Sequence, residues 1–112
     1  MINYNERVFR TISKSNNADV SEETVFQYQQ NSFLVSATYT GGPVLFGHLL
    51  GLVNNEGVME FSYHHVNNDG DIRTGVCIST PEIQPDGKIR LYEKWKWTNG
   101  DGSEGESVIE EI

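Results

Sequence analysis

The chain has 112 residues, with 16 Asp and Glu against 8 Lys and Arg, and a formal net charge of −8. This length predicts a single domain over residues 1–112 with one modest core, and the acidic balance disfavours nucleic acid or a membrane as the main partner. The single cysteine, Cys77, excludes an intramolecular disulfide, and the first residues lack the charged and apolar regions of a secretory signal. We therefore expect a cytoplasmic protein.

Clusters of Gly, Pro, Asn and Asp divide the chain into eight short segments with the composition of β-strands. Gly and Asn accept positive φ and Pro presets φ, so each cluster can reverse the chain. The expected strands are 7–13, 24–30, 33–40, 44–53, 58–67, 71–80, 88–98 and 106–112. Turns at this spacing, without a long helical period, predict an all-β protein: a single eight-stranded antiparallel up-and-down β-barrel, with fewer than about a tenth of its residues in helices. Closure would also remove exposed strand edges.

Hydrophobic matching predicts how segments 44–53 and 58–67 pair. The matched pairs are Leu52 with Met59, Leu50 with Phe61, His48 with Tyr63, and Phe46 with His65. These eight side chains would then face inward, because shifting one strand by a residue would bury Glu60, Ser62 and His64. Gly47 and Gly51 would lie on the outer face and relieve crowding where the sheet bends. A bulge at Gly57 would shift this pairing by one residue.

Two later segments differ in how clearly they show an inner face. In segment 71–80, either the Thr74, Val76 and Ile78 set or the Arg73, Gly75 and Cys77 set could face inward, and Pro81 is expected to end the strand. Segment 88–98 places one row inside the barrel: Ile89, Leu91, Glu93, Trp95 and Trp97. The opposite row is a basic stripe on the solvated face: Lys88, Arg90, Lys94 and Lys96.

Glu93 is the anomaly in this inward row, where an apolar residue is expected. A buried carboxylate must find a partner or raise its pKa, so we expect Glu93 to be buried and to contact a His, Tyr or Arg side chain. The candidate partners are His48, His65, Tyr63 and Tyr28. Either Glu93 is the polar centre of a ligand cavity, or it belongs to a buried ion pair that fixes the register.

The leading hypothesis is a non-enzymatic barrel that binds a small molecule. Its cavity candidates are Tyr28, Phe46, His48, Phe61, Tyr63, His65, Glu93, Trp95 and Trp97. One alternative is a small barrel enzyme that uses Glu93 with His48 or His65 for acid–base chemistry. A second alternative is a packed barrel that acts as an interaction domain.

Cofactors and catalytic motifs find little support in the sequence. Only His48, His65 and Glu93 could approach a two-His-one-carboxylate metal set, and no Cys or His spacing supports it, so we expect no metal and no other cofactor. The sequence contains no nucleotide-binding, hydrolase or acetyltransferase motif. It leaves open whether the protein is an enzyme and whether it forms a homo-oligomer.

The residues also resemble a known family of small uncharacterised bacterial proteins. The matching runs are VFQYQQ, ATYTGG, GHLLGLV, YHHVN, GKIRLYEKWKWTNGD and SVIEEI. The most specific part is the W-x-W-T-x-G-D segment that begins at Trp95. Members are often labelled N-acetylglutamate synthase, but the α/β fold and the Gly-containing pyrophosphate loop of the usual acetyltransferases are not legible here. In architecture the pattern is similar to lipocalin-like and avidin-like barrels, which implies a fold and fixes no ligand.

Overall fold

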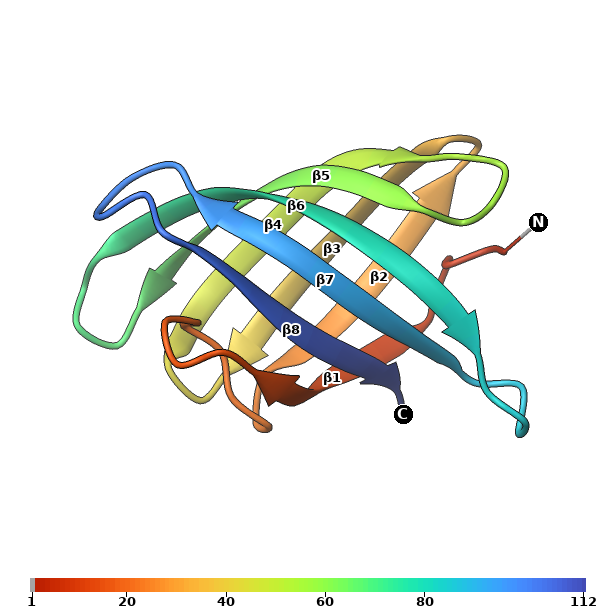
Figure 1. Ribbon diagram of the computed structural model, residues 1–112, viewed down its shortest axis with the longest axis horizontal. Helices are drawn as coiled ribbons and strands as arrows, with labels where there is room; N and C mark the ends of the chain where they lie inside the picture. Colours follow the sequence, from red (N-terminus) through yellow and green to blue (C-terminus); the bar gives the residue numbers. More distant parts are fainter. Residues whose placement is uncertain (1) are drawn as a thin grey trace.

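Eight antiparallel strands close into a barrel in the computed structural model, which describes residues 2–112 (Figure 1). The strands are β1 (Val8–Lys14), β2 (Val25–Asn31), β3 (Leu34–Gly41), β4 (Val44–Val53), β5 (Met59–Asn67), β6 (Ile72–Ile83), β7 (Ile89–Trp97) and β8 (Glu104–Glu111). Each strand pairs with the next in sequence, and β8 closes the barrel against β1. Residues 2–112 contain no helix, so the prediction of an all-β up-and-down barrel is confirmed. Accordingly, the described chain has no helix long and apolar enough to cross a membrane.

Strand β6 is longer than the sequence predicts. It continues through Pro81 to Ile83, and Pro81 pairs with Leu91 of β7. Pairing with β5 ends at Ser79, so beyond that residue β6 has a neighbour on one side only. Proline lacks the backbone N–H but is tolerated where a strand edge is free. The expectation that Pro81 ends the strand was therefore wrong.

The pairing of β4 with β5 differs from the prediction by one residue. Gly51 pairs with Phe61 and Gly47 with His65. The prediction was right for β5, whose residues 59, 61, 63 and 65 face inward, and wrong for β4. Contrary to expectation, four β4 side chains point away from the interior: Phe46, His48, Leu50 and Leu52. Part of the reason is the turn at residues 54–58. Gly57 has φ 82° there and forms the bulge, which adds one residue to the turn and shifts the pairing.

The inward glycines of β4 give the second reason. A Cβ atom at Gly47 would overlap the ring of Tyr39, and a Cβ atom at Gly51 would overlap the Glu60 carbonyl and the Cα and Cβ of Phe61. The interior of an eight-stranded barrel is narrow, so the Tyr39 ring fits only because its paired neighbour Gly47 has no side chain, and β5 approaches β4 closely only because Gly51 has none. Gly47 and Gly51 therefore lie on the inner face, not on the predicted outer face.

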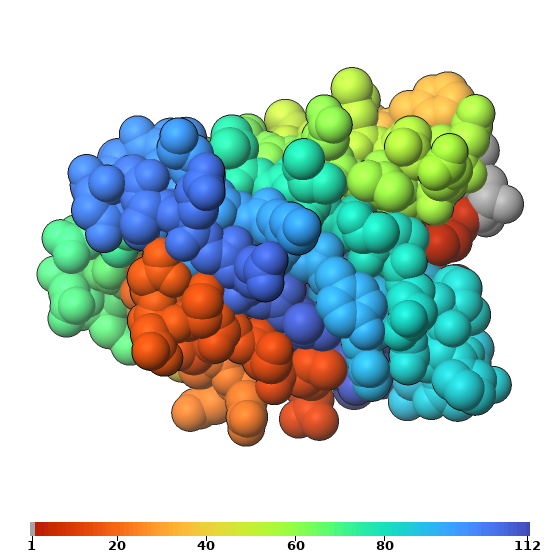
Figure 2. Space-filling model, in the orientation of Figure 1, coloured from red at the N-terminus to blue at the C-terminus, as the bar shows by residue number. Residues whose placement is uncertain are grey.

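The two ends of the barrel are filled differently. At the end that holds the N-terminus, Tyr4 packs against Phe9 and Tyr28, with ring centroids 6.4 and 6.0 Å away. The Tyr4 hydroxyl donates to the Gly57 carbonyl at 2.5 Å and fixes this plug. The opposite end is covered by the β1–β2 loop, residues 15–24, which lies against the C-terminal strands (Figure 2, orange against blue). The remaining open space lies beneath this loop.

Strand β7 follows the predicted alternation throughout. Its inward row is buried, and the basic row lies on the outside. Arg90 of that row donates to Glu110 of β8 at 2.8 Å, and Lys94 and Lys96 stand opposite Glu106 and Glu104. The basic stripe therefore balances carboxylates of the neighbouring strand, as expected of a solvated face.

Candidate functional site

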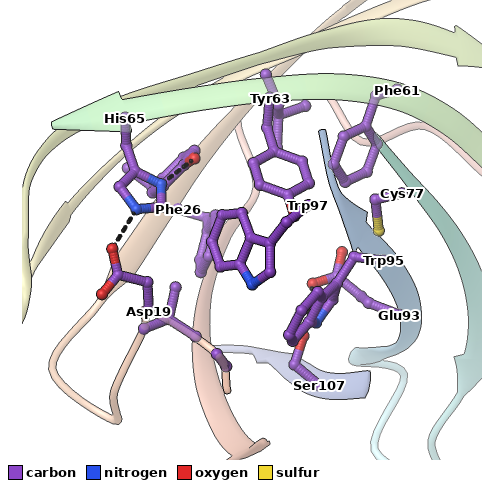
Figure 3. Close-up of a pocket in the computed structure, with 14 residues that line it drawn as sticks. Asp19, Phe26, Phe61, Tyr63, His65, Cys77, Glu93, Trp95, Trp97 and Ser107 are labelled. Carbon is purple, nitrogen blue, oxygen red and sulfur yellow. Dashed lines mark hydrogen bonds and ion pairs between the residues drawn. The ribbon is translucent and has the colours of Figure 1, made fainter. Parts of the chain in front are cut away.

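A cavity of about 50 Å³, measured as the space open to the centres of water molecules, lies beneath the β1–β2 loop (Figure 3). Most of its wall is apolar and aromatic. The lining residues are Ala18, Asp19, Val20, Phe26, Tyr39, Leu49, Phe61, Tyr63, His65, Cys77, Glu93, Trp95, Trp97 and Ser107. Seven of the eight strands and the loop contribute to this wall.

Four aromatic rings form a continuous wall that we call the aromatic wall: Phe61, Tyr63, Trp97 and Trp95. Successive ring centroids lie 6.4, 5.7 and 5.3 Å apart, within the range of favourable edge and tilted packing. Two of the rings rest on glycines, because a Cβ at Gly75 would overlap Tyr63 and one at Gly105 would overlap Trp95. The glycines of β6 and β8 thus allow the rings of the aromatic wall to pack directly against the backbone of these strands.

Glu93 lies beside this wall and is 7% exposed. It is paired across the sheet with Ser79 of β6 and Ser107 of β8. The Ser107 hydroxyl donates to Glu93 Oε1 at 3.4 Å, and no described residue forms a hydrogen bond with Oε2. Burial raises the pKa of the Glu93 carboxyl to about 7, and the Ser79 and Ser107 hydroxyls oppose this shift. The predicted burial of Glu93 is confirmed, but its hydrogen-bond partner is a serine and not the expected His, Tyr or Arg.

His65 occupies the other side of the cavity, with both ring nitrogens engaged. The Tyr39 hydroxyl lies 2.9 Å from Nδ1, and Asp19 Oδ2 lies 2.7 Å from Nε2. Burial lowers the pKa of His65, against the hydrogen bond and charge of Asp19, while burial raises that of Tyr39. We therefore assign a neutral imidazole that accepts from Tyr39 and donates to Asp19.

The Asp19–His65 contact also closes the cavity, because Asp19 belongs to the β1–β2 loop. Asn67 donates to the same carboxylate oxygen at 3.2 Å. Nearby, the Trp97 indole donates to the Asn17 carbonyl at 3.1 Å, and the Asn17 side chain donates to the Glu104 carbonyl at 2.8 Å. In the view of Figure 3 the Trp97 indole lies between the His65–Asp19 pair and Glu93. The loop is thus fastened to both sides of the barrel mouth.

Comparison with known proteins places the chain in a family. The profile of the avidin-like protein family matches residues 2–112. The chain belongs to the avidin-like family. Neither the curated proteins nor the solved structures gave a significant match. For this avidin-like chain the family agrees with the closed eight-stranded barrel, but a shared fold does not transfer a ligand.

The structure brings together six of the nine cavity candidates of this avidin-like protein: Phe61, Tyr63, His65, Glu93, Trp95 and Trp97. Tyr28 is fully buried but lies outside the cavity lining, in the aromatic plug at the other end. The prediction that Phe46 and His48 line the cavity was wrong, since both side chains point outward from β4. His48 consequently cannot join His65 and Glu93 at one metal ion, and residues 2–112 contain no group of three His, Cys, Asp or Glu side chains placed to hold one.

The sequence did not reveal the loop residues that cover the cavity. Asp19 lies in a polar segment, Asn16 to Asp19, whose composition predicts a turn and no binding role. Ser107 and Cys77 could have been found from strand alternation, had the inward faces of β6 and β8 been assigned. Nothing local marks Asp19, because its partner His65 lies 46 residues away along the chain.

Proposed function

We propose that this avidin-like protein is a binding protein that holds one small molecule between the aromatic wall and Glu93. The supporting observation is the buried Glu93 Oε2, which has no hydrogen-bond partner among the described residues. Leaving a buried polar atom unpaired costs about 1–3 kcal/mol. A bound molecule that donates an N–H or O–H to Oε2 would remove this cost, and the apolar wall would contact the rest of it.

The size of the cavity limits the size of this molecule. A cavity of about 50 Å³ exceeds the roughly 10–15 Å³ that one water requires and holds only a few waters. Pockets that hold drug-sized ligands are larger, roughly 300–1,000 Å³. We therefore propose a ligand of about four or five non-hydrogen atoms while the β1–β2 loop is closed. A larger ligand would require the Asp19–His65 contact to open.

Acid–base catalysis has less support than binding. His48 lies on the outer face, and both nitrogens of His65 are occupied by Tyr39 and Asp19. Of the three residues proposed for acid–base catalysis, only Glu93 has a free atom in the cavity. Neither histidine is therefore free to act as the second acid or base beside Glu93.

The proposed function can be tested by titrating labelled protein with tert-butanol, a neutral probe of suitable size. The indole N–H resonances of Trp95 and Trp97 report on the cavity wall in nuclear magnetic resonance spectra. We expect saturable shifts in the wild type and none in Ala18→Leu, whose larger side chain fills the cavity from the loop. Unmoved indole signals in the wild type, or the same shifts in Ala18→Leu, would refute the proposal. Native mass spectrometry of the purified protein would then search for a co-purifying natural ligand.

We also propose a partner: a second copy of the chain, bound through the outer face of β4 to β6. Four side chains there are 46–62% exposed: Leu50, Leu52, Val76 and Ile78. The sheet register places them in two adjacent rows across β4 to β6, and in each row a polar residue of β5, Ser62 or Glu60, lies between the apolar residues of β4 and β6. Glu60 lies within these rows, and Lys94 continues one of them onto β7. A two-fold axis would place the apolar rows against each other and would let charges of opposite sign meet.

Sedimentation velocity tests this second proposal. Ile78→Lys should convert the wild-type dimer into a monomer, because a charged side chain would be buried in the interface. Ile83→Lys is the matched control, since Ile83 is equally apolar and exposed on the same strand but lies at its far end. A monomeric wild type, or a dimer that survives Ile78→Lys, would refute the proposed interface.

A further inference from the structure

The cavity contains a carboxyl group without a counter-ion. Among the residues that line it, the acids are Glu93 and Asp19, and no Lys or Arg is present. Asp19 accepts hydrogen bonds from His65 and Asn67 at the mouth, whereas the hydrogen bond to Glu93 comes from the Ser107 hydroxyl and leaves Oε2 unpaired. Buried carboxylates are normally paired with a cation, because leaving one alone in an apolar site is costly.

The wall next to Glu93 suits a cation that also carries alkyl groups. The faces of Trp and Tyr rings carry negative charge density that attracts ammonium and guanidinium groups within about 6 Å. Trp97 already shows this property, because the guanidinium carbon of Arg73 lies 3.9 Å from its ring centroid. Arg73 is not among the residues that line the cavity, so its charge does not neutralise Glu93.

We propose that the ligand is a small alkylammonium ion with at least one N–H, which donates to Glu93 Oε2 while its alkyl groups pack against Tyr63, Trp95 and Trp97. This inference rests on the proposed function and specifies the chemical class of the ligand. The N–H bond to a carboxylate is a charge-assisted hydrogen bond, stronger than one between neutral groups.

The other charges around the site are compatible with a cation. The chain carries a net charge of −8, which raises the local concentration of cations. His65 is held neutral by burial, which lowers its pKa, and burial also raises the pKa of the Cys77 thiol, which therefore stays uncharged. An anionic ligand would meet the carboxylate of Glu93 directly. A neutral ligand would leave that carboxylate uncompensated above its pKa of about 7.

The test compares two probes of nearly the same shape, tert-butylammonium and tert-butanol. Both are titrated at about pH 8.5, where Glu93 is ionised and the amine, like a lysine side chain, is charged. The measured quantity is the ratio of the two dissociation constants, obtained from the indole N–H resonances. We expect the wild type to prefer tert-butylammonium by about ten-fold or more, and Glu93→Gln to bind both probes about equally.

Two further variants separate the effect of Glu93 from those of net charge and of the aromatic wall. Glu106→Gln removes the same charge from the outer face of β8 and should keep the wild-type preference, which excludes a general effect of net charge. Trp95→Phe should reduce the preference, because phenylalanine binds cations less strongly than tryptophan, and its effect does not depend on any change at Glu93.

The outcomes separate this inference from the proposed function. If tert-butanol binds in the cavity and tert-butylammonium binds no better, the cavity binds small molecules and the ammonium class is wrong. If Glu93→Gln retains the wild-type preference, the carboxyl is not the recognition group and the inference fails. If neither probe binds the wild type, the proposed function fails as well.

Discussion

Replacing Glu93 with glutamine should make the protein more stable at alkaline pH and flatten its pH dependence. Glu93→Gln keeps the shape and the hydrogen-bonding atoms of the side chain but cannot ionise. In the wild type, burial raises the pKa of Glu93 from 4.5 to about 7. The folded state therefore keeps this proton over a pH range in which the unfolded chain has already lost it.

The sign and size of the effect follow from this difference. The contribution of Glu93 to stability is highest below about pH 4.5, falls as the pH rises to about 7, and stays reduced above that, where ionisation of Glu93 costs the folded state about 3 kcal/mol. Between about pH 5 and pH 8.5 the wild type should lose about 2.5 kcal/mol relative to Glu93→Gln. That loss corresponds to a difference of roughly 1–2 M in the midpoint of urea unfolding.

Urea unfolding followed by tryptophan fluorescence measures this difference. His65 adds an opposite trend, because its lowered pKa destabilises the fold as the pH falls below 6.5. That trend is common to both proteins and cancels when the variant is compared with the wild type at each pH. Glu106→Gln should show no such pH-dependent difference. If the free energies of unfolding of the wild type and Glu93→Gln run parallel between about pH 5 and pH 8.5, Glu93 is not buried as the structure shows.

Three further predictions concern the loop and the wall. Asp19→Ala should leave the His65 Nε2–H unpaired and open the cavity, which a thiol reagent would detect as faster labelling of Cys77, whereas Asp19→Asn should label at nearly the wild-type rate. Cys77 in the wild type should react slowly, since the side chain is buried and its pKa is raised; rapid labelling of the native protein would contradict this. Gly75→Ala should destabilise the protein by about 1–3 kcal/mol, because the new methyl group would displace Tyr63, and unchanged thermal unfolding would show that the ring has room to move.

The sequence was most informative where one strand carried both large apolar residues and charges. In β7 the tryptophans and lysines alternate, so the inner face, and with it the burial of Glu93, could be read directly. In β4 the same reasoning failed, because apolar residues occupy the outer face and glycines the inner one. Hydrophobic matching assumes that the larger apolar row is buried, and an exposed apolar surface on β4 reverses that assumption.

The sequence by itself determined the strand count and the inward position of Glu93, because turn residues and period-two alternation act over a few neighbouring residues. Tertiary structure alone decided which face of β4 is buried, since that depends on whether the Tyr39 ring and the backbone of β5 find space beside the glycines of β4. It alone also brought Asp19 to His65, at 2.7 Å across the barrel mouth. Such contacts join residues far apart in the chain, and only the closed barrel places them within hydrogen-bonding distance.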